Sequence, residues 1–133
     1  MAIKHIQPRG LFTAKGMSHV VVSEGRLAHI AGQGAYDEHF TLIGAGDYVA
    51  QTIQAYQNLR QALAAVGARP EQVVSSTIYL VGLNAQVTEQ FVSAMNQALD
   101  GKPFPAHAST LVGVSQLAYP DMLVEISAVA ALD

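Results

Sequence analysis

Glu125 is the first residue of this sequence that could do chemistry, because it interrupts the apolar run 122–129. Such a run is typical of a buried strand, and strand alternation places Leu123, Ser127 and Val129 on the same face as Glu125. If another subunit covers that face, the carboxylate is partly desolvated and can serve as a proton donor or acceptor near neutral pH. The alternative interpretation is a glutamate on an edge strand, wetted by solvent or paired with a basic side chain.

Hydroxyl groups and a histidine form a second candidate segment before Glu125. Ser109 and Thr110 begin the expected strand 109–114, where their hydroxyls can contact a ligand or simply reflect strand preference. Gly113 marks a place at which a ligand or another backbone segment comes close. His107 lies beside this segment and is the only candidate for function among the five histidines.

Two glycines flank Gln33 at the end of another expected strand. Gly32 and Gly34 can present backbone N–H groups to an anion, or they can form an ordinary turn. No two histidines have the HxxxH spacing of a helical metal site, and the chain has no cysteine. We therefore expect neither a metal site nor thiolate chemistry. The motifs GxSxG and GxGxxG and the phosphate-binding loop are missing from the sequence as well.

The composition limits the class of protein. The length predicts a single domain over residues 1–133. Hydrophobic residues make up 50% and charged residues 13%, and this excess of apolar surface predicts an oligomer. The net charge is −3 and the seven Lys and Arg residues are scattered, so we do not expect nucleic acid as a partner. No apolar run has the length of a membrane span and no signal-peptide core is recognisable, so we expect no membrane association and a cytoplasmic location.

Periodicity and turn residues indicate the elements that must position these groups. Apolar residues at helical spacing predict a helix over 48–66, capped by Asp47 and ended by Gly67, and a second helix over 84–99, capped by Asn84. The expected strands are 3–6, 18–22, 27–31, 72–81, 109–114 and 123–130.

This order of elements predicts an α+β fold. The turn Ser23-Glu24-Gly25 predicts a hairpin between the strands 18–22 and 27–31. Two helices can cover one face of a mixed sheet of five to six strands, and the chain has nothing left to cover the other face. A symmetric oligomer that packs its sheets against one another would bury that face.

The order of elements and several short motifs together resemble the Rid (YjgF-like, L-PSP) family of small imine and enamine deaminases. The matching segments are Ser18-His19-Val20-Val21, 27–33, Gln51-Thr52 after Asp47, 73–81, Pro105-Ala106 ahead of 109–114, and Leu123-Val124-Glu125-Ile126. The resemblance spans about residues 16–131. It implies a chorismate-mutase-like fold and a homotrimer in which the sheets line a central barrel, with ligand sites in the clefts between subunits.

The resemblance also implies a reaction. Family deaminases hydrolyse 2-imino or 2-enamino acids to 2-keto acids and ammonia, without a metal or another cofactor. A glutamate positions or activates the water, and Glu125 matches it. A family arginine grips the substrate carboxylate, but its position falls on Ser109 here, or on His107 in a looser alignment. Met17 stands where the family has a tyrosine. This chain therefore looks like a branch that lacks the arginine, whose loss weakens carboxylate binding by about 10- to 100-fold.

Two functions remain open on the sequence. In the first, the protein is a hydrolase of a small imine, enamine or related metabolite. Glu125 handles the water, Ser109 and Thr110 orient the substrate, and Gly32 and Leu111 contribute backbone groups. In the second, the protein binds a small ligand in the same cleft for a regulatory or other non-catalytic purpose.

Overall fold

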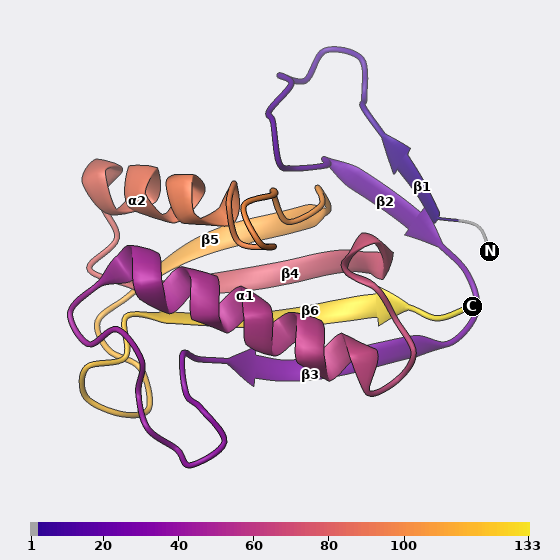
Figure 1. The fold of residues 1–133 in the computed structure, drawn as a ribbon. Helices are drawn as coiled ribbons and strands as arrows, with labels where there is room; N and C mark the ends of the chain where they lie inside the picture. Colours follow the sequence, from indigo (N-terminus) through magenta and orange to yellow (C-terminus); the bar gives the residue numbers. More distant parts are fainter. Residues whose placement is uncertain (1–2) are drawn as a thin grey trace.

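Six strands and two helices follow one another in the expected order (Figure 1). In this computed structural model, residues 3–133 are described. The strands are β1 (Ile3–Ile6), β2 (Val20–Ser23), β3 (Leu27–Gln33), β4 (Val73–Val81), β5 (Ala108–Val114) and β6 (Val124–Ala131). The helices are α1 (Tyr48–Ala64) and α2 (Ala85–Met95), with a single 3-10 turn, η1 (Pro70–Gln72), before β4.

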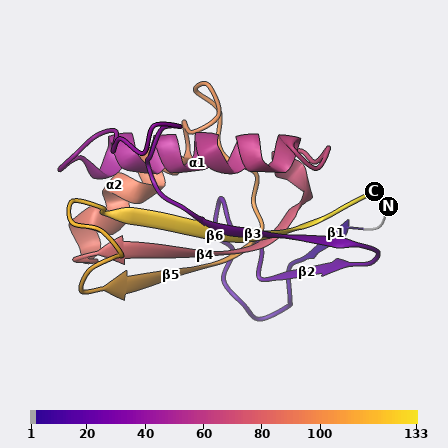
Figure 2. The same cartoon turned by 90° about the horizontal axis from the view of Figure 1, so that it is seen from below.

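The strands form one layer and the helices a second layer on one side of it (Figure 2). Four strands pair in the order β3-β6-β4-β5, with β4 and β5 parallel and the other pairs antiparallel. β1 and β2 form a separate antiparallel pair beside that sheet. The predicted α+β fold, with two helices on one face of a mixed sheet, is confirmed. Hydrogen bonding divides its six strands into groups of four and two.

The predicted hairpin between β2 and β3 is wrong. β2 pairs with β1, while β3 pairs with β6 from Leu27↔Ala131 to Gln33↔Ile126. The turn does bend at Gly25, where φ is +93°, but a turn signal fixes where the chain bends and not which strand becomes the partner. The N–H of Leu132 donates to the carbonyl of Arg26 at 2.9 Å, which starts the ladder of β3 on β6.

Both helices begin where their capping residues predict. The side chain of Asp47 accepts a hydrogen bond from the N–H of Ala50 at 3.0 Å, and that of Asn84 accepts from the N–H of Val87 at 2.8 Å. These bonds satisfy N–H groups that lack a partner in the first turn. The helices end at Ala64 and Met95, earlier than expected. Neither helix within residues 3–133 has the length and apolarity needed to cross a membrane.

The core lies between the helices and one face of the sheet. On β6, Val124, Ile126 and Ala128 are buried, whereas Glu125 and Ser127 between them are only half-buried. This alternation confirms the two faces expected from the sequence. The buried core side chains include Ala55, Tyr56, Leu59, Leu63, Ile78, Leu80, Phe91 and Phe104. No helix of the described chain covers the face that carries Glu125, as Figure 2 shows. We call this face the open face.

Candidate functional site

Glu125 and Gly32 lie against each other at one end of the sheet. A Cβ atom built on Gly32 would lie 2.5 Å from Oε2, 2.7 Å from Cδ and 2.8 Å from Cγ of Glu125. The carboxylate side chain therefore lies across the backbone of β3, in space that only a glycine leaves free. The structure brings these two predicted residues together. Gly32 acts by this close approach within the strand and does not form a turn.

A cleft of about 180 Å³ opens beside the Glu125 carboxylate. We call it the Glu125 cleft. Its lining residues are Gly32, Gly34, Tyr36, Phe40, Ala118, Tyr119, Met122 and Glu125. Within residues 3–133 the ion pairs are Arg60–Asp100 and His39–Glu38. No basic side chain of that range therefore forms an ion pair with Glu125. The alternative of a glutamate paired with a basic side chain does not hold within one protomer.

Three aromatic side chains form one wall of the Glu125 cleft. The rings of Tyr36 and Phe40 stack with their centroids 4.4 Å apart and 15° between their planes. The ring of Tyr119 meets both edge-on, at 6.3 Å from Tyr36 and 5.1 Å from Phe40. These geometries are favourable for aromatic pairs. Sequence reasoning missed these three residues, and the only signal was aromatic residues in two expected loops, where binding residues often lie.

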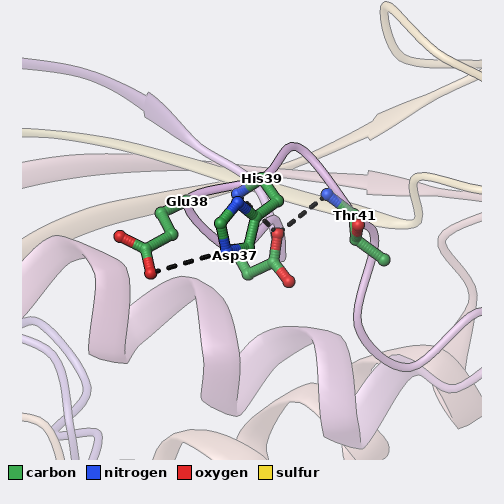
Figure 3. A network of polar contacts seen from close by, with 4 residues as sticks. All are labelled: Asp37, Glu38, His39 and Thr41. Atoms are coloured by element: carbon green, nitrogen blue, oxygen red, sulfur yellow. Dashed lines mark hydrogen bonds and ion pairs between the residues drawn. The ribbon is translucent and has the colours of Figure 1, made fainter.

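The loop that carries Phe40 is held by several hydrogen bonds. The Asp37 carboxylate accepts from the backbone N–H groups of His39 and Thr41, each at 2.9 Å (Figure 3). The side-chain amide of Asn58 on α1 donates to the carbonyls of Gly34 and Tyr36 at 2.8 and 2.9 Å. The aromatic wall is therefore fixed to α1 and to its own turn.

Ser109 and Leu111 point away from Glu125. Ser109 pairs with Ser76 and Leu111 with Ile78. Ser76 and Ile78 are buried on the helix-covered face, and paired residues of neighbouring strands share a face. Leu111 packs against the core accordingly. Within one protomer, Ser109 therefore lies on the opposite side of the sheet from the carboxylate.

Thr110 shares the open face with Glu125 but lies in a different part of it. Thr110 pairs with Thr77, which pairs with Ser127 on β6. Because β4 lies between β5 and β6, two strand spacings, or about 10 Å, separate Thr110 from β6. Ser75, Thr77, Ser127 and His29 line a separate hollow of about 240 Å³ on this face. One protomer does not bring Thr110 to Glu125.

His107 is buried on the far side of the molecule from the Glu125 cleft. Its side chain is 2% exposed, with Nε2 at 2.6 Å from Oγ of Ser76 and Nδ1 at 2.8 Å from the carbonyl of Pro105. Because that carbonyl can only accept, Nδ1 carries a proton, and Nε2 of the neutral ring accepts a hydrogen bond from the Ser76 hydroxyl. Burial lowers the pKa of His107, the Pro105 contact raises it in part, and His5 lowers it further. Both ring nitrogens of His107 therefore have a partner within the protomer.

Met17 lies near His107 and not near Glu125. It forms a parallel bridge with His107, whose carbonyl accepts from the N–H of Ser18 at 3.0 Å. Met17 also lines a small groove of about 120 Å³ with the end of β1. The candidate residues thus fall into two groups, Glu125 with Gly32 at one end of the sheet, and the residues around His107 at the other. No group of three or more His, Cys, Asp or Glu side chains within residues 3–133 is arranged to hold a metal ion.

Known proteins share this fold and much of this sequence. The family model described as "Endoribonuclease L-PSP" matches residues 10–132. The chain is 32% identical over 111 residues to a RutC family protein, PH0854, of Pyrococcus horikoshii, covering 82% of each chain. Among solved structures, YyfB of Yersinia pestis, a protein of unknown function from the Rid family, is 32% identical, covers 99% of this chain and 100% of its own, and has a TM-score of 0.83.

A second solved structure agrees. Rv2704 of Mycobacterium tuberculosis, a member of the YjgF/YER057c/UK114 family, is 29% identical, with 89% of this chain and 88% of that chain covered and a TM-score of 0.62. The fold and these matches define the class as small α+β proteins of the L-PSP type. The chain belongs to the Rid/YjgF/L-PSP family, which confirms the resemblance seen in the sequence.

Proposed function

We propose that this protein hydrolyses a small imine, enamine or related metabolite in the Glu125 cleft. One observation carries the proposal: the carboxylate lies over Gly32 at the cleft, with no basic partner in the described chain. A carboxylate that is not neutralised by the protein is free to exchange a proton with water or with a ligand. The resemblance to family deaminases supports the same reaction.

The reaction adds one water molecule to the imine. Glu125 accepts a proton from the water while the water oxygen forms a bond to the imine carbon, and the nitrogen takes up a proton from solvent, which gives a carbinolamine. Glu125 then returns its proton to the nitrogen as the C–N bond breaks. Ammonia leaves with the electron pair of that bond. The hydroxyl group releases its proton to solvent, and the carbon keeps the oxygen as a carbonyl group. The products are one carbonyl compound and one ammonia.

In this proposal the assembly is a homotrimer, a number that rests on the family resemblance, and the site is completed between its copies. Two observations support it: the open face has no cover, and the candidate residues are divided between the two ends of the sheet. Ser109 and Thr110 of one copy would approach Glu125 of another, with Leu111 offering backbone groups. Met17 and His107, which form a bridge next to the start of β5, would hold that strand in place.

A non-catalytic ligand-binding protein is the second candidate. It is favoured by Ser109, which stands where the resemblance places a carboxylate-binding arginine. RNA cleavage, which the name of the matching family model mentions, has less support. The seven Lys and Arg residues are scattered and the net charge is −3, whereas phosphate binding needs clustered positive charge.

The first test measures ammonia release from imines generated in place by an amino-acid oxidase or a threonine dehydratase, or by an amine oxidase, whose imine has no carboxylate. Wild type should accelerate release, and Glu125→Gln should slow it by at least about 100-fold, the scale of a lost acid–base group. Glu89→Gln, an exposed glutamate on α2, is the matched control. An inactive wild type that gains activity in Ser109→Arg would instead favour a scaffold that serves another ligand.

A further inference from the structure

The charge of the Glu125 cleft restricts what can bind there. Its lining contains one carboxylate, three aromatic rings, one thioether and no lysine, arginine or histidine. A ligand carboxylate placed beside Glu125 would meet a like charge, and such contacts are strongly unfavourable where water is partly excluded. A cation would meet an opposite charge instead, and aromatic ring faces attract cations within about 6 Å of their centroids.

The aromatic wall is exposed within one protomer. Phe40 is 59% exposed and Tyr119 51% exposed, although a phenylalanine is normally buried and a tyrosine is normally buried in part. Phe40 also has φ of +60°, in the left-handed region that a residue with a bulky side chain rarely adopts. Its loop holds this strained conformation through the Asp37 turn. Strain that keeps an aromatic ring at a cleft points to ligand contact.

We propose that the Glu125 cleft binds a planar cation that carries an aromatic ring, namely the iminium form of an aryl-substituted imine, and discriminates against carboxylates. The ring would pack against Phe40 and Tyr119, and the protonated C=N group would face Glu125. Within one protomer the cleft has a volume of about 180 Å³, which is below the range of drug-sized pockets and suits one ring with one short planar group. This inference rests on the proposed function, because it names the substrate class of the same cleft.

The ligand class can be tested without turnover. Phenylacetamidine is a stable planar cation that mimics an iminium ion, and phenylacetate has nearly the same shape with the opposite charge. Titration calorimetry of the whole protein with each compound compares them directly. We expect phenylacetamidine to bind at least about tenfold more tightly than phenylacetate. Equal affinity, tighter binding of phenylacetate, or no detectable binding of the amidine would overturn the proposal.

Variants locate the binding in the cleft. Phe40→Ala should weaken phenylacetamidine binding by about tenfold, whereas Phe40→Tyr, which keeps the ring, should stay close to wild type. Glu125→Gln should remove most of the preference for the cation. Phe12→Ala is the control, since Phe12 is 69% exposed but lies outside the cleft, and it should bind as wild type does. Equal weakening by Phe12→Ala and Phe40→Ala would place the binding elsewhere and contradict the proposal.

Turnover separates this proposal from the proposed function. An amine oxidase acting on 2-phenylethylamine supplies an aryl imine without a carboxylate, and an amino-acid oxidase acting on phenylalanine supplies the matching 2-imino acid. Faster hydrolysis of the first imine would support both proposals. Faster hydrolysis of the imino acid would uphold the hydrolase and overturn the ligand class. Selective binding of phenylacetamidine without hydrolysis of either imine would uphold the ligand class and overturn the hydrolase.

Discussion

Polar side chains lie at both ends of the four-stranded sheet, but their surroundings differ. At the end where β6 begins, the Glu125 carboxylate lies over Gly32 and faces a cleft. At the end where β5 begins, His107 is buried and each ring nitrogen has a partner, Ser76 or Pro105. We call these the Glu125 end and the His107 end.

The difference shows why a histidine beside a hydroxyl is not by itself a catalytic pair. Ser76 and His107 are 2.6 Å apart, which is a suitable distance for a nucleophile and its base. Both are buried, however, and the cleft residues do not include them. Buried polar groups that satisfy one another stabilise a fold, whereas a charged group that faces a cleft is available to a ligand.

The largest expected effect is a loss of folding stability caused by His107→Ala at the His107 end. The substitution leaves a cavity and removes the partner of the buried Ser76 hydroxyl and of the part-buried Pro105 carbonyl, so we expect the free energy of unfolding to fall by about 3 kcal/mol. Urea denaturation measures it. The control is His39→Ala, whose side chain is 79% exposed and which should change stability by less than about 0.5 kcal/mol. Equal effects of the two substitutions would show that the His107 contacts contribute nothing.

The next effect concerns activity at the Glu125 end. Gly32→Ala places a methyl group 2.5–2.8 Å from the Glu125 side chain, so the carboxylate must move. A displacement of this size should lower kcat/KM by about 100-fold if Glu125 handles the water. Gly34→Ala is the comparison, because the one close contact of its Cβ would be the flexible end of Met122 at 2.7 Å, with the Tyr36 ring at an ordinary 3.5–3.6 Å. A smaller loss in Gly32→Ala than in Gly34→Ala would argue against a role for the carboxylate.

The pH dependence of stability should report on the His107 end. Because the pKa of His107 is lowered in the folded protein, the unfolded chain takes up a proton first as the pH falls below about 6.5. Stability is therefore complete above that pH and declines below it, by up to about 1.4 kcal/mol per pH unit from this group. Denaturation curves of wild type and His107→Gln between about pH 5 and 7 would measure it. The slope in wild type should exceed that of the variant; parallel slopes would contradict the prediction.

The smallest expected effect tests whether the left-handed backbone conformation of Phe40 lowers stability while its ring contributes to ligand binding in the cleft. Phe40→Gly removes the cost of the left-handed conformation and should raise the free energy of unfolding by about 1 kcal/mol. The same variant should bind phenylacetamidine more weakly, because the ring is gone. A thermal melt and a titration on one preparation measure both. A variant that is less stable than wild type would show that the Phe40 ring packing outweighs the backbone strain.

Local features of the chain were predictable. Asp47 and Asn84 cap the helices as expected, because the acceptor and the N–H that it binds lie three residues apart. The alternation along β6 also follows from local geometry, since successive side chains point to opposite faces of any strand. The pairing of β2 was not predictable in this way, because β1 and β3 are both near it in sequence and the choice depends on the rest of the sheet.

The site was predictable only in part. Glu125 stood out because a carboxylate in an apolar strand is costly to desolvate and is often kept there for its chemistry. The contact with Gly32 places these two residues together. Ser109 and Thr110 are neighbours in sequence, yet their side chains lie on opposite faces of the sheet. The two side chains of one protomer therefore cannot contact the same atom of a ligand. Phe40 and Tyr119 meet across loops nearly eighty positions apart, for which the sequence has no local signal.

The sequence alone determined the elements, their order and the face on which Glu125 lies, because caps and side-chain periodicity act over a few residues. Tertiary structure alone decided which strands pair. It also decided that Ser76 and Pro105 bind both ring nitrogens of His107, and that three aromatic rings line the cleft beside the carboxylate. These features depend on contacts between distant segments, and such contacts form only when the whole core assembles.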